Sequence, residues 1–168
     1  MAKALPSRAR LEELFTYEPL TGALRWKRAP PYQKRQLDGQ PAGTFDKRGY
    51  VRVRVDGVRF QVHRLIWFLV HGQDPGDREI DHIDGDRSNN RLDNLRLATH
   101  GQNTHNRGPD KGRHLPKGVY SRRKRFGAQI MFNNQTQWLG TFDTPEEAHA
   151  AYCKAAKELH GSFARTAK

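Results

Sequence analysis

An aspartate and a histidine stand side by side at Asp81 and His82, in a segment rich in acidic and amide side chains. A further carboxylate follows at Asp84, and amides follow at Asn94 and Asn103. Carboxylate and amide oxygens suit a hard divalent cation such as Mg²⁺, which takes few protein ligands and keeps several waters. Histidine is the side chain that accepts a proton near neutral pH. The segment therefore contains the groups needed for metal-assisted hydrolysis.

Plainer interpretations of this segment stay open at this point. A stretch rich in aspartate and asparagine is often a series of solvated turns, and a lone histidine is more often structural than catalytic. A calcium-binding loop that begins at Asp84 is excluded by its pattern. Its sixth position is Asn89 instead of glycine, and its twelfth is Leu95 instead of glutamate.

The spacing of the candidate residues resembles that of the HNH nuclease family, in its homing-endonuclease branch. Asn94 lies twelve residues after His82, and Asn103 lies nine residues further on. The surrounding segments VHRLIWFLVHG, IDHIDGDRSNNRLDNLRLAT and GQNTHN also resemble that branch, and together they fall within residues 39–107. The resemblance implies a ββα-metal fold, in which a two-stranded ribbon and a helix surround one divalent ion.

The resemblance also implies a role for each candidate. His82 is expected to be the general base, and Asp81 and Asn103 are expected to bind the metal ion. Asn94 is expected to hold the His82 ring in its productive orientation and tautomer. Some relatives have a third histidine ligand where this chain has Arg107. We therefore expect one Mg²⁺ or Mn²⁺ ion and not a three-histidine Zn²⁺ site, with Arg107 facing the scissile phosphate.

The charge of the chain points to a polyanionic partner, because its formal net charge is +12 and its pI is near 10.3. Residues 1–60 carry a net +7, residues 61–110 carry −2, and residues 111–168 carry +7. This distribution suits a protein that binds phosphates through its N-terminal and C-terminal parts and binds a cation in its central part. Arg52 and Arg54 alternate with valines, which fits equally a solvated strand face or a phosphate-binding one.

Composition excludes several other classes of protein. Cys153 is the one cysteine of the chain, so a disulfide framework and a multi-thiolate zinc site are excluded. Hydrophobic residues make up 35%, and no run approaches the roughly 18 apolar residues that a membrane-spanning helix needs. The first residues lack the apolar stretch of a signal peptide, so we expect a cytoplasmic protein. The resemblance suggests a bacteriophage or mobile-element origin, and we expect the protein to act in the cytoplasm of the host cell.

The C-terminal part, residues 117–161, resembles the plant ethylene-response-factor DNA-binding domain through the segments KGVY, AQI, WLGTF, EEA and AY. That domain implies a three-stranded antiparallel sheet backed by one helix, with the sheet in the major groove of DNA. Met131 and Thr136 stand where the plant proteins have arginine, so their target sequence does not carry over. The outward face of this sheet is expected to carry Arg123, Arg125, Gln129, Met131 and Trp138, although a one-residue slip of the register would exchange these for their neighbours. The side chains expected to contact DNA are Arg122, Arg123, Lys124, Arg125, Gln129 and Trp138.

Local patterns predict an α+β chain. Helical spacing predicts helices over residues 7–17, 63–71 and 145–160, the last with a capping box at Thr144. Strands are predicted over residues 23–26, 50–55, 58–62, 118–121, 126–132 and 136–139. The predicted domains are a basic N-terminal region with a helix and a hairpin, the HNH core, a linker and a DNA-binding domain, at residues 1–60, 61–107, 108–117 and 118–163.

The sequence thus predicts a metal-dependent HNH endonuclease of the homing type that acts on double-stranded DNA. It would be a monomer or a homodimer, and a monomer would nick, because one active site cuts one strand. The competing hypothesis is a sequence-specific DNA-binding regulator without catalytic activity. An RNA-directed nuclease is disfavoured, since the sequence shows no aromatic stacking platform of the usual kind.

Overall fold

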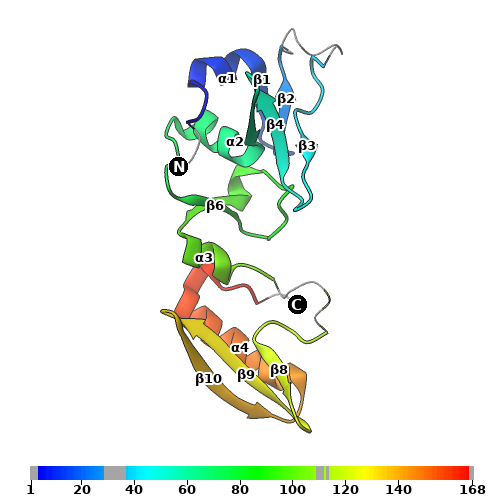
Figure 1. The fold of residues 1–168 in the computed structure, drawn as a ribbon, viewed down its shortest axis with the longest axis vertical. Helices are drawn as coiled ribbons and strands as arrows, with labels where there is room; N and C mark the ends of the chain where they lie inside the picture. Colours follow the sequence, from blue (N-terminus) through cyan, green and yellow to red (C-terminus); the bar gives the residue numbers. More distant parts are fainter. Residues whose placement is uncertain (1–3, 29–36, 109–111, 113, 167–168) are drawn as a thin grey trace. The chain divides into compact units, whose positions relative to one another are not determined.

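The chain folds as two compact units, Met1–Thr99 and His100–Lys168. The computed structural model describes residues 4–28, 37–108, 112 and 114–166, and its mixture of helices and small antiparallel sheets confirms the α+β class (Figure 1). No helix in these described ranges is both long and apolar enough to cross a bilayer.

The units divide the chain at a different place from the sequence-based domains. The boundary after Thr99 falls inside the HNH core that we predicted at residues 61–107. The predicted linker, residues 108–117, lies partly outside the described residues, which omit 109–111 and 113. The domain limits drawn from the sequence therefore stay a prediction.

The described residues of the first unit form two longer helices and three small antiparallel sheets, with strand orders β1-β2, β3-β4-β5 and β6-β7. Its elements in chain order are α1 (Arg8–Leu14), β1 (Phe15–Glu18), β2 (Ala23–Trp26), β3 (Thr44–Phe45), β4 (Val51–Val55), β5 (Val58–Gln61), α2 (Val62–His71), β6 (Glu79–His82), η1 (Leu92–Asn94) and β7 (Leu95–Ala98).

The β4–β5 hairpin forms as its alternation predicts. Val53 and Val55 are buried, whereas Arg52 and Arg54 are exposed. The turn between the strands places both Asp56 and Gly57 at positive φ, which is the backbone conformation of the two-residue hairpin turn. The hairpin therefore contributes apolar side chains to the core on one face and basic side chains to the surface on the other.

Helix α1 is shorter than predicted. We expected a helix up to residue 17, but Phe15 leaves the helix and begins β1 opposite Trp26. The two rings lie 4.6 Å apart, so this tertiary contact favours the strand over one more helical turn. Both rings join a core that includes Leu11, Leu65 and other buried side chains from α1, β2, β4, α2, β6 and β7.

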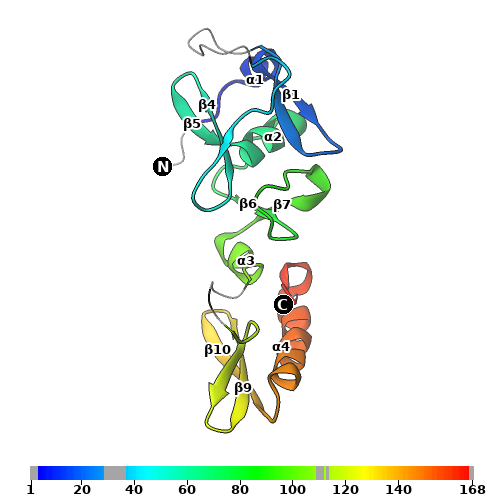
Figure 2. The same ribbon diagram turned by 90° about the vertical axis from the view of Figure 1, so that its right-hand side faces the viewer.

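The second unit is a three-stranded antiparallel sheet with one long helix on it, together with a short helix, α3 (His100–His105). Its other elements are β8 (Val119–Arg122), β9 (Arg125–Phe132), β10 (Gln135–Phe142), α4 (Pro145–His160) and η2 (Gly161–Phe163). Helix α4 lies along one face of the sheet (Figure 2). The predicted capping box is present: the Thr144 hydroxyl accepts from the Glu147 amide, and the Glu147 carboxylate accepts from the Thr144 amide.

Strand register gives the two faces of this sheet different chemistry. Ala128 is buried with Ala148 of α4, and Ile130 is buried with Tyr152 and Ala156 of the same helix. Gln129, between the two buried strand residues, is exposed on the opposite face. The sheet register predicted from the sequence therefore has the correct parity.

Gly118 offers a test of how α4 packs on this sheet. A Cβ at Gly118 would overlap the Tyr152 ring, and its φ of +80° disfavours any L side chain. We expect Gly118→Ala to lower the free energy of unfolding by roughly 3 kcal/mol, measured by urea denaturation of the full chain. Gly161→Ala is the matched control, because Gly161 also has positive φ but has nothing within 4 Å. It should cost about 1 kcal/mol, and an equal loss in the two variants would contradict the packing.

Candidate active site

The β6–β7 hairpin carries the candidate catalytic pair. Antiparallel pairing sets Asp81 opposite Arg96 and His82 opposite Leu95. Asp81 and His82 are each only 3% exposed. Because neighbouring strand residues point to opposite faces, burial of both means that β6 is covered on its two sides. Two polar side chains are thus withdrawn from water at one point of the chain, which requires that each has a partner.

The His82 ring is oriented by a hydrogen bond to Asn90 and by aromatic neighbours. Its Nε2 lies 2.9 Å from Oδ1 of Asn90. An amide oxygen only accepts, so Nε2 carries the proton and Nδ1 is the basic nitrogen of the neutral ring. The ring of His63 meets it edge-on at 5.1 Å, and that of Tyr50 lies at 6.0 Å. The surroundings therefore select both an orientation and a tautomer.

Burial also keeps His82 neutral. Desolvation lowers the pKa of the His82 imidazole below its usual value. The hydrogen bond that His82 donates to Asn90 and the nearby carboxylates of Asp84, Asp81 and Asp86 oppose this shift but do not cancel it. At pH 7 the ring is therefore in the form that can accept a proton.

Asp81 is held by a guanidinium. Arg96 donates from Nε to Oδ2 of Asp81 at 2.8 Å, and its Nη2 lies 2.7 Å from the same oxygen. The two side chains are 16% and 4% exposed. A buried carboxylate is a hard oxygen donor, which is what Mg²⁺ prefers, and its charge must be balanced by a cation. Asp81 therefore has the chemistry required of the metal ligand that was predicted at this position.

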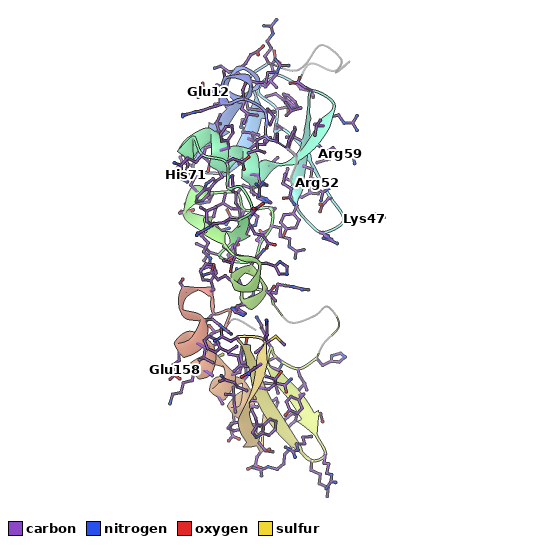
Figure 3. The ribbon with its side chains drawn as sticks, turned by 60° about the vertical axis from the view of Figure 1, so that its left-hand side comes forward. Glu12, Lys47, Arg52, Arg59, His71 and Glu158 are labelled. Carbon is purple, nitrogen blue, oxygen red and sulfur yellow. The ribbon has the colours of Figure 1, made fainter. Side chains whose placement is uncertain are left out.

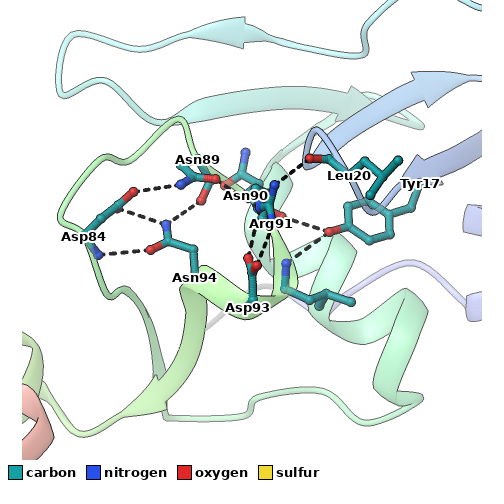
Figure 4. Close-up of polar contacts among 9 residues, drawn as sticks. Tyr17, Leu20, Asp84, Asn89, Asn90, Arg91, Asp93 and Asn94 are labelled. Carbon is teal, nitrogen blue, oxygen red and sulfur yellow. Dashed lines mark hydrogen bonds and ion pairs between the residues drawn. The ribbon is translucent and has the colours of Figure 1, made fainter.

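Asn94 does not hold His82, so that prediction was wrong in its detail. The Asn94 side chain donates to Oδ1 of Asp84 at 2.9 Å and to the carbonyl of Asn89 at 2.8 Å, and it accepts from the Asp84 amide at 3.0 Å (Figure 4). Asn94 is the last residue of η1, and its backbone carbonyl accepts from the Ile83 amide at 2.9 Å, at the start of the same loop. Asn94 shapes the loop, and Asn90 within that loop contacts the imidazole.

A tyrosine from the first hairpin anchors the same loop. The Tyr17 hydroxyl donates to the carbonyl of Asn90 and accepts from the amide of Leu92, both at 3.2 Å (Figure 4). Arg91 donates to the carbonyl of Leu20 at 2.9 Å. These contacts tie the loop to β1 and the turn that follows it. The position of the Asn90 side chain therefore depends on residues about 70 positions earlier in the chain.

The other predicted site residues lie on several elements. Asn103 lies on α3, in the second unit, and is half-buried, and Arg107 is exposed just after that helix. The basic run occupies the end of β8, the turn and the start of β9, where Arg122, Arg123, Lys124 and Arg125 are all exposed. Within the described residues, no three His, Cys, Asp or Glu side chains gather as a metal-binding group.

Three residues of this site were missed by the sequence reasoning. The sequence offers a clue to Asn90, because it belongs to the Asn89-Asn90 pair between the two candidate residues His82 and Asn94. Arg96 had a weaker one, since its pairing with Asp81 follows only once the register of the hairpin is known. Tyr50 had none, because it reaches the site from outside the hairpin.

Comparisons with known proteins find similarities to HNH endonucleases. A family model described as HNH endonuclease matches residues 60–105. An uncharacterized HNH endonuclease of Acanthamoeba polyphaga mimivirus is 37% identical over 120 residues, which cover 70% of this chain and 62% of that protein. Protein 3.8 of Escherichia phage T7 is 31% identical over 115 residues, which cover 61% of this chain and 87% of that protein. The chain belongs to the HNH endonuclease family.

Two further similarities extend over smaller parts. The chain of this HNH family member is 48% identical over 44 residues to the ethylene-responsive transcription factor LEP of Arabidopsis thaliana, which covers 25% of this chain and 21% of that protein. A solved structure that describes DNA binding and cleavage by the HNH homing endonuclease I-HmuI is 26% identical, with a TM-score of 0.42. The match covers 60% of this chain and 55% of that one. The chain spans about three fifths of the mimivirus protein's length.

The buried histidines make stability depend on pH. Burial, followed by the charges of His82, Arg64 and Arg52, lowers the pKa of His63 to about 3. The unfolded chain takes up this proton near pH 6.5, whereas the folded chain resists it. Stability is therefore fully present above pH 6.5 and is lost as the pH falls from 6.5 toward 3. We expect His63 to contribute up to about 1.4 kcal/mol per pH unit in that range, measured by urea unfolding from pH 7 to pH 5.

The variant His63→Gln should flatten this pH dependence by about one proton, because glutamine does not titrate. A slope in His63→Gln equal to that of the wild type would show that His63 is not the group involved.

Proposed function

We propose that this HNH family member is a DNA endonuclease that hydrolyses phosphodiester bonds with one divalent metal ion and His82 as general base. The observation that carries the proposal is the fixed imidazole of His82, whose Nε2 is bonded to Asn90. Its basic Nδ1 takes the proton of the attacking water while the ring stays in place. Cleavage would leave 5′-phosphate and 3′-hydroxyl ends, as the family resemblance implies.

The metal ion belongs beside Asp81 in this proposal. The buried Asp81 carboxylate supplies one hard oxygen, and the amide oxygen of Asn103 is the second ligand that the family pattern assigns. When bound, the ion stabilises the negative charge that develops on the phosphate and on the departing 3′ oxygen. Mg²⁺ is the favoured ion, with Mn²⁺ as an alternative, because the candidate ligands are oxygens and not thiolates or three imidazoles.

The exposed face of the β4–β5 hairpin is the proposed phosphate-binding surface of the first unit. Arg52 and Arg54 on β4 point outward with Arg59, which is paired with Arg54 across the hairpin. Arg52 and Arg59 project from this hairpin, and Lys47 lies on the neighbouring turn (Figure 3). Arg52 forms an ion pair with Asp46 at 2.8 Å, which fixes its position on that face. A row of guanidinium groups on a flat strand face suits the DNA backbone.

The exposed face of the C-terminal sheet is the proposed reader of the DNA sequence. Gln129 on β9 lies opposite Trp138 on β10, and the Arg122 guanidinium lies 5.1 Å from the centre of the Trp138 ring. Stacking on the indole restrains Arg122, so less side-chain entropy is lost when it binds a base edge. Arginine reads guanine and glutamine reads adenine in the major groove. Arg123, Lys124 and Arg125 at the adjoining turn would hold the phosphates, and Arg107 is proposed to face the scissile one.

The catalytic proposal is tested by cleavage of supercoiled plasmid and of a linear duplex. We expect the wild type to cut with Mg²⁺ and not with EDTA, and to nick one strand where it acts as a monomer. His82→Ala should lower the cleavage rate by about 10²- to 10⁴-fold while it still binds DNA, because only the proton acceptor is lost.

The control His71→Ala should cut like the wild type. Asn90→Ala should cut more slowly than Asn90→Asp, since aspartate keeps an acceptor for the Nε2 proton. Equal cutting by His82→Ala and wild type would remove His82 from its role. Binding without cutting by the wild type under all metals would favour a DNA-binding regulator.

The reading role of the sheet is tested with a duplex selected by the wild-type protein from a randomised library. We expect Arg122→Ala with Gln129→Ala to reduce the preference for that duplex over an unrelated one by roughly 10- to 100-fold, because each base contact contributes about 1–3 kcal/mol of discrimination. The cleavage rate of bound DNA should be unchanged. Lys157→Ala, on the exposed side of α4, removes a charge without touching the sheet and should keep the preference. Full preference in the double variant would contradict the reading role.

A further inference from the structure

The proposed reaction uses Asp81 as a metal ligand but gives no part to Arg96, which forms an ion pair with it. It spans the β6–β7 hairpin between directly opposed residues, with both guanidinium contacts on Oδ2 of the carboxylate. A second cross-strand pair, between Arg25 and Glu18 on the β1–β2 hairpin, is 40% and 41% exposed. The Arg96–Asp81 pair is therefore withdrawn from water in a way that the other hairpin pair is not.

A buried carboxylate must have a cation beside it. The cost of removing the charge of Asp81 from water is offset here by Arg96, and removing one partner of such a pair leaves an uncompensated charge in the interior. A divalent ion on the same carboxylate would supply that compensation as well. Arg96 and the metal ion thus have the same electrostatic partner.

We propose that Arg96 is the internal counter-ion of Asp81: it holds the carboxylate in place when no metal ion is bound, and its charge sets how tightly Asp81 binds one. This inference rests on the proposed function, in which Asp81 is a metal ligand. Two cations on one carboxylate repel each other, so Arg96 lowers the affinity for metal while it keeps the empty site folded. By linkage, the metal must weaken the contribution of Arg96 by the same factor.

The geometry makes Arg96 a positioning residue as well as a charge. Nε donates a hydrogen bond to Oδ2, and Nη2 lies 2.7 Å from the same oxygen without a hydrogen bond to it, so the rigid, planar guanidinium restrains the position of that one oxygen. A lysine keeps the charge but has a compact head group on a flexible stem and loses this planar restraint. The effects of charge and of orientation are therefore separable by substitution: Arg96→Gln removes both, and Arg96→Lys removes only the second.

The test is a titration of the full-length protein with Mn²⁺ alone, followed by electron paramagnetic resonance. We expect Arg96→Gln to bind Mn²⁺ at least about threefold more tightly than the wild type, and Arg96→Lys to stay within about twofold. In saturating Mn²⁺, both variants should cleave plasmid more slowly than the wild type, because the carboxylate is less well oriented. Tighter binding together with slower turnover is a combination that a general loss of structure does not produce. Arg25→Gln, which breaks the exposed hairpin pair, is the matched control and should bind Mn²⁺ like the wild type.

The counter-ion role also predicts how the metal affects folding. If Arg96→Gln is unfolded without metal, Mn²⁺ should restore its near-ultraviolet circular dichroism, and if it is folded, Mn²⁺ should raise its thermal midpoint more than that of the wild type. Unchanged or weaker Mn²⁺ binding in folded Arg96→Gln, or failure of Mn²⁺ to restore an unfolded one, would overturn the inference. Asp81→Asn separates this failure from a failure of the proposed function: if it binds Mn²⁺ like the wild type, Asp81 is not a ligand and the metal assignment itself is wrong.

Discussion

The pairing of β6 with β7 is the interaction on which the candidate site depends. This short hairpin pairs Asp81 with Arg96, and it places His82 at the end of β6, directly before the loop that runs from residue 83 to residue 94. Ile80 and Leu95 of the same hairpin are buried in the core of the first unit. Hydrophobic burial therefore stabilises a strand that also carries two polar side chains, and each of these has a partner that offsets its desolvation.

The loop between these strands converts a buried histidine into an oriented base. Asn94 bonds Asp84 and Asn89 across the loop, and Tyr17 binds it from the first hairpin. With the loop fixed, the Asn90 amide meets Nε2 of His82 and the ring cannot rotate without breaking that bond. Burial then lowers the pKa of the imidazole and keeps it neutral. Orientation, tautomer and charge state of one side chain thus have three separate structural causes.

The sequence predicted those features that local rules determine. Strict alternation and the Asp56-Gly57 turn predicted the β4–β5 hairpin, and the capping box at Thr144 predicted the start of α4. The adjacency and spacing of Asp81 and His82 located the candidate site. The end of α1 was not predictable from its own residues, because the contact of Phe15 with Trp26 decides it.

The partner of His82 was not predictable for a similar reason. Three asparagines, at positions 89, 90 and 94, lie within reach of the ring in sequence. Which of them contacts the imidazole depends on the path of the loop, and that path depends on contacts with distant residues such as Tyr17.

We propose that His82 accepts a proton on Nδ1 while Asn90 holds Nε2, and ¹⁵N NMR of the ring nitrogens at pH 7 tests this most directly. We expect a neutral ring with its proton on Nε2. A ring with its proton on Nδ1, or on both nitrogens, would contradict the assignment of Nδ1 as the proton acceptor.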